Sequence, residues 1–272
     1  MPAIFAHYSF GMQAVARFAP EMQRVVRSHE AMYRMGLQGP DFYFFDQLEM
    51  LRGRHLSRVG SAIHRDSCAA LLARLKGSGH KRLDSAALAY VIGLVGHFTL
   101  DSTCHPHIDA WVETLPYEHM RMETEFDRYL LEQAGEDARR YPLGDCIRAG
   151  KRDRLAVGAL YADYSAPDET AALICDFRLI KNLLRTPYDW QYALVQGILR
   201  RVPDSAPIAG VFMGPVDAMS AVTNPRLAAL FDEALERYPK LAASAWAYFC
   251  EDEALDEYFR RNFETAPEED GE

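Results

Sequence analysis

Residues 85–104 read SAALAYVIGLVGHFTLDSTC, and this stretch decides the fold class that the sequence predicts. Apolar residues fill most of its positions, which is typical of a helix buried on nearly all sides. Asp84 stands just before it and can cap the first turn. Gly93 and Gly96 lie one turn before His97, where a neighbouring backbone or a metal can approach closely. The stretch therefore predicts a central core helix that carries polar side chains near its end.

Helical periodicity continues through most of the chain, because apolar residues recur at intervals of three and four. Alternating runs bounded by turn residues are scarce, so we expect few or no strands. Asn224 and Pro225 predict the start of a late helix, and residues 106–118 are expected to form a loop. The sequence predicts an all-α, multi-helix single domain over residues 1–264, with a metal site in 1–130, supporting helices in 131–264 and an acidic disordered tail over 265–272.

The charge of the chain is uneven. The formal net charge is −9 over 272 residues, and residues 251–272 hold most of it, with ten acidic residues against two arginines. The rest of the chain is close to neutral, so the overall acidity says little about a ligand. No basic stripe is present, and we therefore expect no nucleic acid as a partner.

The cysteines and the hydropathy of the chain indicate the cellular compartment in which the protein is expected. The five cysteines are an odd number without a CxxC motif, which favours free thiols in a reducing compartment. The first residues lack a basic segment followed by an apolar run, so no signal peptide is expected. No stretch approaches 18 charge-free apolar residues, so no transmembrane segment is expected either. We expect a cytoplasmic protein, for which peripheral membrane contact stays open.

Five polar side chains lie close together in the sequence: His97, Asp101, His107, His119 and Glu123. Two pairs among them are four residues apart, a spacing that puts both members on one face of a helix, about 5–6 Å apart at Cβ. Imidazole and carboxylate are the nitrogen and oxygen ligands that zinc prefers. All nine histidines of the chain lie at or before His119. The pattern predicts a clustered metal site in the first half of the chain.

Each pair also has a structural interpretation without metal. His97 and Asp101 can form a buried hydrogen-bonded pair that locks a helix. His119 and Glu123 can form an exposed pair of the helix surface, worth only about 0.2–0.5 kcal/mol. The metal interpretation is favoured because the two pairs and a further histidine occur within reach of one another.

These motifs resemble the zinc-dependent phospholipase C family, which is similar to the zinc-dependent single-strand nucleases. The family helix carries His-x3-Asp, a proline-containing turn and a His ten residues after the first, matched here by His97, Asp101, Pro106 and His107. His105 competes with His107 for one role, and the ten-residue spacing favours His107. The next motif is His-x3-Glu, matched by His119 and Glu123. The proline stands one residue later than in the secreted enzymes.

The resemblance also implies earlier ligands: a His near the N-terminus, an Asp in a loop and another His. The best matches are His7, Asp41 and His64. His55 competes with His64, which is preferred because it stands at the start of a predicted helix. The secreted enzymes use their first amino group, exposed by removal of a signal peptide, as a ligand. Since no such peptide is expected here, the third metal position stays open.

The resemblance thus implies an all-helical fold with two or three zinc ions. The implied sets are Asp41, His64, His97 and Asp101 for one ion, His107, His119 and Glu123 for a second, and Asp101 with His7 for a third. It also implies that Asp41 positions or deprotonates the attacking water. The implied function is a zinc-dependent phosphoesterase that hydrolyses a phosphodiester or a phospholipid head group by metal-bound hydroxide.

The sequence leaves alternatives open for Asp41, for residues 42–45 and for the function. Asp41 can be a turn residue after Gly39 and Pro40. The aromatic residues 42–45 can pack in the core or form an apolar wall beside the metals. The alternative function is a non-catalytic helical binding or structural protein with an incomplete metal set. Metal content together with activity on a phosphodiester separates the two functions.

Overall fold

The structure, a computed structural model, describes residues 3–45, 56–77, 83–203 and 205–264. No β-strand occurs in these ranges, so the all-α prediction is confirmed. The elements are α1 Ile4–Ala14, η1 Val15–Arg17, α2 Pro20–Ser28, α3 Glu30–Gly36, η2 Asp41–Phe45, α5 Leu56–Arg65, α6 Cys68–Gly77, α7 Ser85–Thr114, α8 His119–Gln133, η3 Leu143–Ile147, α9 Lys151–Leu160, α10 Pro167–Leu183, α11 Asp189–Leu199, α12 Ala206–Gly210, α13 Ser220–Cys250 and η4 Glu257–Arg260. The predicted tail over residues 265–272 lies outside the described residues.

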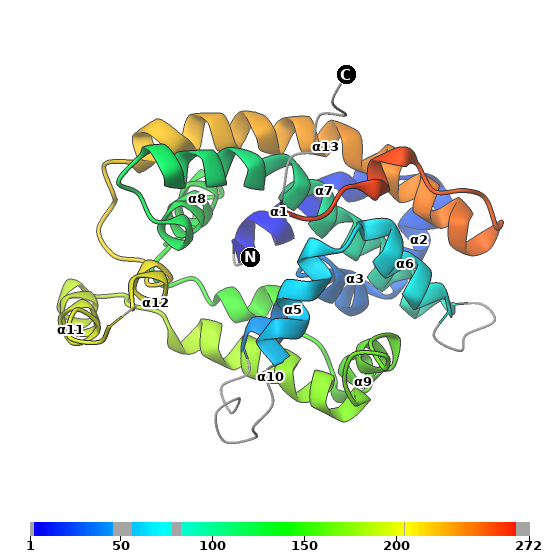
Figure 1. Ribbon diagram of the computed structural model, residues 1–272, viewed down its shortest axis with the longest axis horizontal. Helices are drawn as coiled ribbons and strands as arrows, with labels where there is room; N and C mark the ends of the chain where they lie inside the picture. The colour runs from blue at the N-terminus through cyan, green and yellow to red at the C-terminus, as the bar shows by residue number, and fades with distance from the viewer. Residues whose placement is uncertain (1–2, 46–55, 78–82, 204, 265–272) are drawn as a thin grey trace.

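Helix α7 forms the centre of the molecule and packs most extensively against α3 and α13 (Figure 1). Asp84 caps it as expected, since its carboxylate accepts a hydrogen bond of 2.8 Å from the backbone N–H of Ala87. By length and composition α7 is apolar enough to cross a membrane, but 94% of its most apolar window is buried inside the protein. Within the described residues, it therefore serves as the core helix around which the others are arranged.

Two glycines allow neighbouring helices to approach α7 closely. A Cβ on Gly93 would collide with the Tyr33 carbonyl of α3, and a Cβ on Gly36 would collide with the Tyr90 carbonyl of α7. The two backbones therefore cross in direct contact at this point. This contact sets the position of the chain that follows α3, which includes Asp41.

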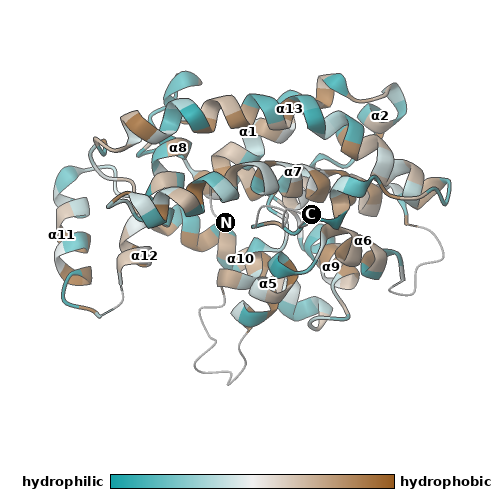
Figure 2. Cartoon of the chain, turned by 45° about the horizontal axis from the view of Figure 1, so that its top comes forward, coloured by the Kyte–Doolittle hydropathy of each residue, from teal (hydrophilic) through white to brown (hydrophobic). Residues whose placement is uncertain are grey.

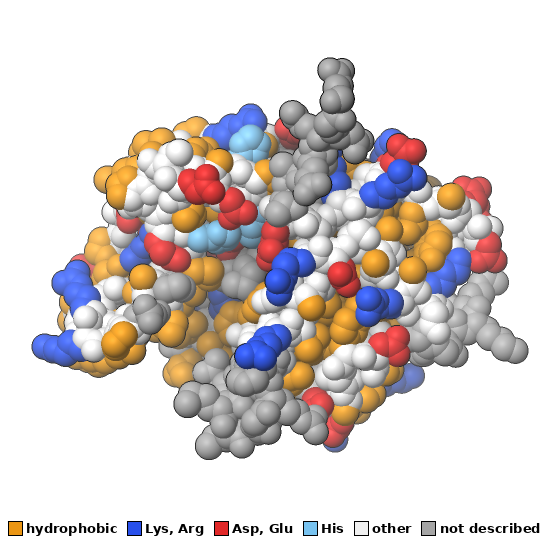
Figure 3. Space-filling view, in the orientation of Figure 1, with side chains coloured by type: hydrophobic (Ala, Val, Ile, Leu, Met, Phe, Trp, Pro, Cys, Tyr) orange, Lys and Arg blue, Asp and Glu red, His pale blue; other side chains and the backbone are white. Residues whose placement is uncertain are grey.

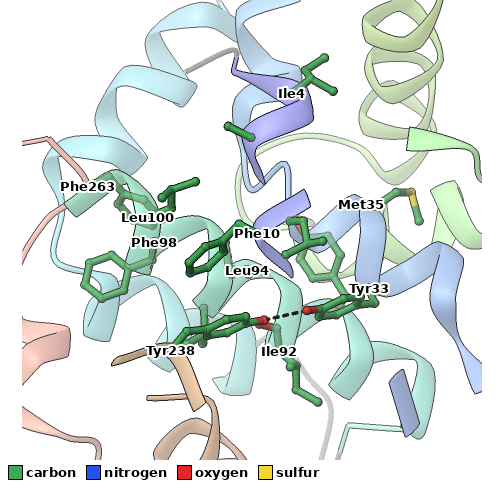
Figure 4. Packing of buried hydrophobic residues seen from close by; sticks show 14 of the residues in the cluster. Ile4, Phe10, Tyr33, Met35, Ile92, Leu94, Phe98, Leu100, Tyr238 and Phe263 are labelled. Atoms are coloured by element: carbon green, nitrogen blue, oxygen red, sulfur yellow. Dashed lines mark hydrogen bonds between the residues drawn. The ribbon is translucent and has the colours of Figure 1, made fainter. Parts of the chain in front are cut away.

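Aromatic side chains fill the space between α7, α1 and α13 (Figure 4). Tyr238 of α13 donates a hydrogen bond of 2.7 Å to the Ile92 carbonyl and lies 3.3 Å, oxygen to oxygen, from Tyr33. Its ring stacks on Phe10 of α1 at 5.2 Å between centroids. The Tyr33 hydroxyl donates in turn to the Gly11 carbonyl of α1 at 2.7 Å. Buried hydroxyls with partners thus link α13, α7, α3 and α1, which fixes α1 beside α7.

Two predictions about proline were wrong. Helix α7 continues through Pro106 to Thr114, although residues 106–118 were expected to form a loop. Helix α13 begins at Ser220, so Pro225 lies inside it rather than at its start. In both places tertiary packing outweighs the cost of a missing backbone donor, about 3 kcal/mol for a proline inside a helix. The continuation of α7 through Pro106 changes which histidine faces the candidate site.

Candidate metal centre

One group of possible ligands joins η2, α5 and α7. Asp41 begins η2, His64 lies near the end of α5, and His97 lies on α7. The Asp41 carboxylate is 3.1 Å from Nε2 of His64 and 3.7 Å from Nε2 of His97. All three side chains are buried, and one ligand atom from each lies within 4.8 Å of the others. The structure thus brings together residues 56 positions apart in the sequence.

A second group lies directly beside the first. Nε2 of His7, on α1, is 3.1 Å from one Asp101 oxygen, and Nε2 of His97 is 3.2 Å from the other. The rings of His7 and His97 are 4.4 Å apart between centroids. His97 therefore belongs to both groups, which is the placement that a shared metal cluster needs.

A third group joins α7 and α8. Nε2 of His119 is 3.0 Å from Glu123 Oε1, and Nε2 of His105 is 3.7 Å from the same oxygen. His105 also approaches Asp101, at 3.5 Å, which links this group to the others. On its outer side, Nδ1 of His119 lies 3.4 Å from Asp109, an arrangement typical of a carboxylate that orients a ligand imidazole.

The structure does not bring His107 to this centre. Because α7 continues through Pro106, residues four apart share a face, and His105 stands four residues after Asp101. His107 points elsewhere, with its ring 6.4 Å from that of Trp111 and beside Arg226. The expectation that His107 joins His119 and Glu123 is therefore corrected to His105, because the turn assumed after Asp101 does not form.

The reason for preferring His64 also needs correction. His64 lies near the end of α5, not at the start of a helix, because the next helix begins only at Cys68. Its Nδ1 is 2.8 Å from the Gly60 carbonyl, which directs Nε2 toward Asp41. The competing His55 lies outside the described residues. The structure thus places His64 in the cluster for a reason that the sequence pattern did not contain.

A glycine makes room for the centre. Gly39 has a positive φ of 52°, and a Cβ there would collide with the His97 ring. Only glycine adopts this conformation without strain and also lets the turn lie against the imidazole. The turn delivers Asp41 to the centre, so the turn interpretation of this segment and the ligand interpretation of Asp41 are compatible.

The buried polar atoms fit a metal. Both ring nitrogens of His97 and Oε2 of Glu123 are buried and make no hydrogen bond to any described residue. Burial lowers the pKa of His97 to about 3, so its imidazole is neutral at pH 7. Leaving such groups without partners is costly, whereas neutral imidazole and carboxylate are what zinc binds. The donor set and its unsatisfied atoms are those of a cation site.

The carboxylates are held in their charged form. Burial raises the pKa of Asp101, but the electrostatic effect of neighbouring groups, His105 and His7 among them, outweighs it, so this pKa lies well below its usual value. Burial likewise raises the pKa of Asp41, yet this pKa also lies below its usual value, with the hydrogen bond and charge of His64 contributing. Burial alone would lower the pKa of His119, yet Glu123 and then Asp109 raise it to about 10. Without metal, protons on imidazoles therefore balance the buried carboxylates.

A hollow of about 440 Å³ opens onto the third group, and we call it the metal hollow. It is lined by Phe44, Ser61, His105, Asp109, Glu118, His119, Met120 and Glu264. Figure 3 shows histidine surface flanked by acidic side chains where this face of the molecule is hollowed. No lysine or arginine occurs among these lining residues. The metal hollow therefore attracts cations, and an anionic substrate needs bound cations to enter it.

The aromatic residues 42–45 divide between the two expected roles. Phe42 and Tyr43 are buried in the core, and Phe45 packs on Phe177 at 4.4 Å between ring centroids. Phe44 instead lies 5.3 Å from the His64 ring and lines the metal hollow. One aromatic side chain of the four thus forms an apolar wall beside the possible ligands.

Two supporting residues were missed in the sequence. Asp127 on α8 accepts hydrogen bonds from the backbone N–H groups of Phe5, at 3.2 Å, and Ala6, at 2.7 Å, and so fixes the start of the helix that carries His7. It stands four residues after Glu123, so helical spacing was a usable signal. Phe263 covers the rings of His64 and His97 at 5.1 and 5.8 Å, and no local pattern marks it.

The family comparison agrees with this geometry. A family model described as zinc dependent phospholipase C matches residues 6–184 of the chain. The chain belongs to the zinc-dependent phospholipase C family. The match contains every possible ligand described above and ends before α11. No curated protein and no solved structure matches the chain significantly. Membership supports a zinc-dependent, phospholipase C-like function, and the groups of His and Asp described above are its candidate metal site.

Proposed function

We propose that the protein is a zinc-dependent phosphoesterase that hydrolyses a phosphodiester, with a phospholipid head group as the favoured substrate. The single observation that carries the proposal is the convergence of five imidazoles and three carboxylates, Asp101 among them, from separate elements in a largely buried centre beside an open hollow. A merely structural polar core would satisfy its own hydrogen bonds, and His97 does not.

We assign the ligands as follows. Asp41, His64, His97 and Asp101 would hold one zinc ion, His105, His119 and Glu123 would hold a second, and His7 with Asp101 would contribute to a third position. When bound, zinc ions polarise a phosphoryl oxygen and bring the pKa of a bound water close to neutrality. Asp109 holds the His119 ring in orientation from its outer side.

Asp41 is better suited to position water than to deprotonate it. Its carboxylate is buried between His64 and His97, and its pKa lies below the usual value. A general base works best with a pKa near the working pH, whereas a carboxylate that stays ionised accepts a hydrogen bond without taking the proton. We therefore propose that Asp41 orients the attacking water.

A lipid substrate is favoured by the surface of α11. Trp190, Leu194 and Ile198 are 65%, 56% and 53% exposed and lie four residues apart on one face of this helix. Figure 2 shows hydrophobic positions on α11 at the edge of the molecule. Arg200 and Arg201 follow directly at the helix end and are exposed. An exposed apolar face with an interfacial tryptophan and flanking arginines is typical of a helix that lies on a phospholipid surface.

Vesicle sedimentation tests this surface. Wild-type protein is expected to co-sediment with phosphatidylcholine vesicles containing anionic lipid, and Leu194→Glu with Ile198→Glu is expected to weaken binding at least about tenfold. Val222→Glu, at an equally exposed apolar position on α13, is the matched control and should bind normally. If the α11 variant binds vesicles normally but changes the oligomeric state, the face belongs to a second copy of the chain.

Activity together with zinc content tests the function itself. The zinc-loaded protein is expected to hydrolyse a chromogenic phosphodiester, to lose this activity with a chelator and to regain it with zinc. A protein that holds its full zinc complement and hydrolyses neither the chromogenic ester nor vesicle phospholipid would instead be the non-catalytic binding protein. That outcome rejects the hydrolase proposal.

We also propose a cytoplasmic location. Cys68, Cys104 and Cys146 are buried and form no disulfide with any described residue. Buried unpaired thiols are typical of proteins kept in a reducing compartment. Cell fractionation checks this, and recovery from an oxidising compartment would contradict it.

A further inference from the structure

A second hollow, of about 280 Å³, lies beside α7 and shares no lining residue with the metal hollow. Arg226, Arg237 and Arg261 line it, together with the hydroxyl groups of Ser102, Thr103 and Tyr258. We call it the arginine hollow. Its side chains come from α7, from α13 and from the segment around η4, so it exists only in the folded chain.

Arg237 is held rigidly in this hollow. Its Nη1 donates hydrogen bonds of 2.9 Å to Thr103 and 3.3 Å to the Tyr258 hydroxyl, and its Nη2 donates to Glu233 at 2.8 Å. A guanidinium fixed in this way loses little freedom when it binds a further group, because its orientation is already set. The hollow therefore has one preorganised donor.

The other two arginines are not neutralised. The Arg261 guanidinium lies over the Tyr258 ring at 4.4 Å from its centroid. Neither Arg261 nor Arg226 forms an ion pair within 4 Å with any described residue. Glu233 is the one acidic residue among the lining side chains, and it already pairs with Arg237. The hollow thus carries an excess of positive charge in a chain whose net charge is −9.

We propose that the arginine hollow binds a phosphate group. Guanidinium groups match the oxygens of phosphate in geometry and charge. The Tyr258 hydroxyl, which accepts from Arg237, can add one donor, whereas Ser102 and Thr103 already donate to the Phe98 and Thr99 carbonyls. The volume suits a single phosphate with a small substituent, not a chain of them. The proposal goes beyond the hydrolytic function, since no residue of the metal hollow lines the arginine hollow.

The two hollows are separate, but α7 and the segment over residues 261–263 run from one to the other. Ser102 and Thr103 follow Asp101 on α7, and Arg261 stands two residues before Phe263, which covers His64 and His97. The backbone N–H of Phe263 donates to the His64 carbonyl at 3.1 Å. A phosphate bound by Arg261 therefore sits next to a segment that packs on the metal centre.

Titration calorimetry with inorganic phosphate, at constant ionic strength in sodium chloride, tests the proposal. The purified full chain is expected to bind phosphate saturably. Arg226→Glu combined with Arg261→Ala is expected to weaken binding at least about tenfold, because two charged donors are lost. Arg152→Glu combined with Lys151→Ala, which makes the same total change of charge at two exposed positions of α9, should leave the affinity unchanged. Absence of saturable binding, or equal loss in the control, overturns the proposal.

A second variant separates this site from the metal centre. Asp101→Asn, which is expected to disturb the metal centre alone, should still bind phosphate. If phosphate binding is lost in Asp101→Asn but retained in the arginine variant, the anion binds only at the metals and the proposal is wrong. Glycerol phosphate and vesicles containing phosphatidic acid then distinguish a soluble ligand from a lipid head group. Binding of either that depends on Arg226 and Arg261 supports the proposal.

Discussion

The two hollows beside the C-terminal half of α7 differ in the charge of the side chains that line them. The metal hollow is lined by His105, His119 and three acidic residues, with no arginine or lysine among its lining residues. The arginine hollow is lined by three arginines and one paired acid. His105 and His107 stand only two residues apart in the sequence, yet they line different hollows.

Because of this difference, one helix borders both a metal-dependent and a metal-independent environment for phosphate. An acidic hollow repels phosphate until cations occupy it, so any phosphate chemistry there depends on metal. The arginine hollow needs no metal, because guanidinium groups carry permanent charge. Changes on the metal side should therefore act through zinc, and changes on the arginine side should not.

The largest expected effect comes from Asp101→Asn. Asp101 approaches His7, His97 and His105, so its loss disturbs every group of ligands. We expect zinc content to fall and phosphodiesterase activity to drop more than about 100-fold, since even changes to residues behind metal ligands cost 10–100-fold. Metal quantification and steady-state kinetics check this, with His29→Ala as the control. Full zinc content in Asp101→Asn would refute the ligand assignment.

The next effect separates the two histidines. His105→Ala is expected to lose zinc from the second position, whereas His107→Ala should retain its zinc, because only His105 faces Glu123 and His119. Zinc equivalents per chain, measured on both purified variants, provide the test. The opposite result would show that α7 bends at Pro106 when the metals bind.

A stability effect is expected from Asp127. Asp127→Ala leaves the backbone N–H groups of Phe5 and Ala6 without their acceptor and should lower the free energy of unfolding by about 2 kcal/mol. Asp127→Asn keeps one acceptor oxygen and should cost less. Urea unfolding followed by circular dichroism measures both. Unchanged stability in Asp127→Ala would show that the start of α1 is held by other contacts.

The smallest expected effect is the dependence of zinc affinity and of metal-free stability on pH. In the metal-free protein the pKa of His119 is raised to about 10 and that of His64 is also raised, so zinc must displace protons from both. Zinc affinity should therefore rise with pH, by up to about tenfold per unit for each proton released. Since the folded pKa of His119 exceeds the ordinary value of 6.5, its contribution to metal-free stability is complete below about pH 6.5 and is lost as pH rises through about 10.

Calorimetry in buffers of different ionisation enthalpy measures these protons directly. A zinc titration near pH 7 that releases no protons would contradict the charged state assigned to His119. The guanidinium groups of the arginine hollow keep their protons when phosphate binds, so any protons released there come from the phosphate itself.

Much of the site follows from helical spacing alone. His97 with Asp101 and His119 with Glu123 are pairs of the i,i+4 kind, and the structure places both pairs on faces that meet. The all-α fold follows in the same way from apolar periodicity. Local rules succeed here because each pair depends only on one regular helix.

The errors arise where packing overrides a local rule. A proline normally ends a helix, which predicted a loop from residue 106, and the ten-residue spacing of the family motif favoured His107. The buried helix instead continues, and His105 lies on the face that meets α8. The cover that Phe263 forms over His64 depends on a segment about 200 residues away, which no local spacing encodes. The arginine hollow was missed for the same reason, since its arginines come from two distant segments.

The most direct test of the account is a crystal structure of the zinc-loaded protein with anomalous data collected at the zinc absorption edge. Anomalous peaks are expected among Asp41, His64, His97 and Asp101, and between His105, His119 and Glu123, with none in the arginine hollow. A centre without peaks, or with zinc held by His107, would contradict this expectation.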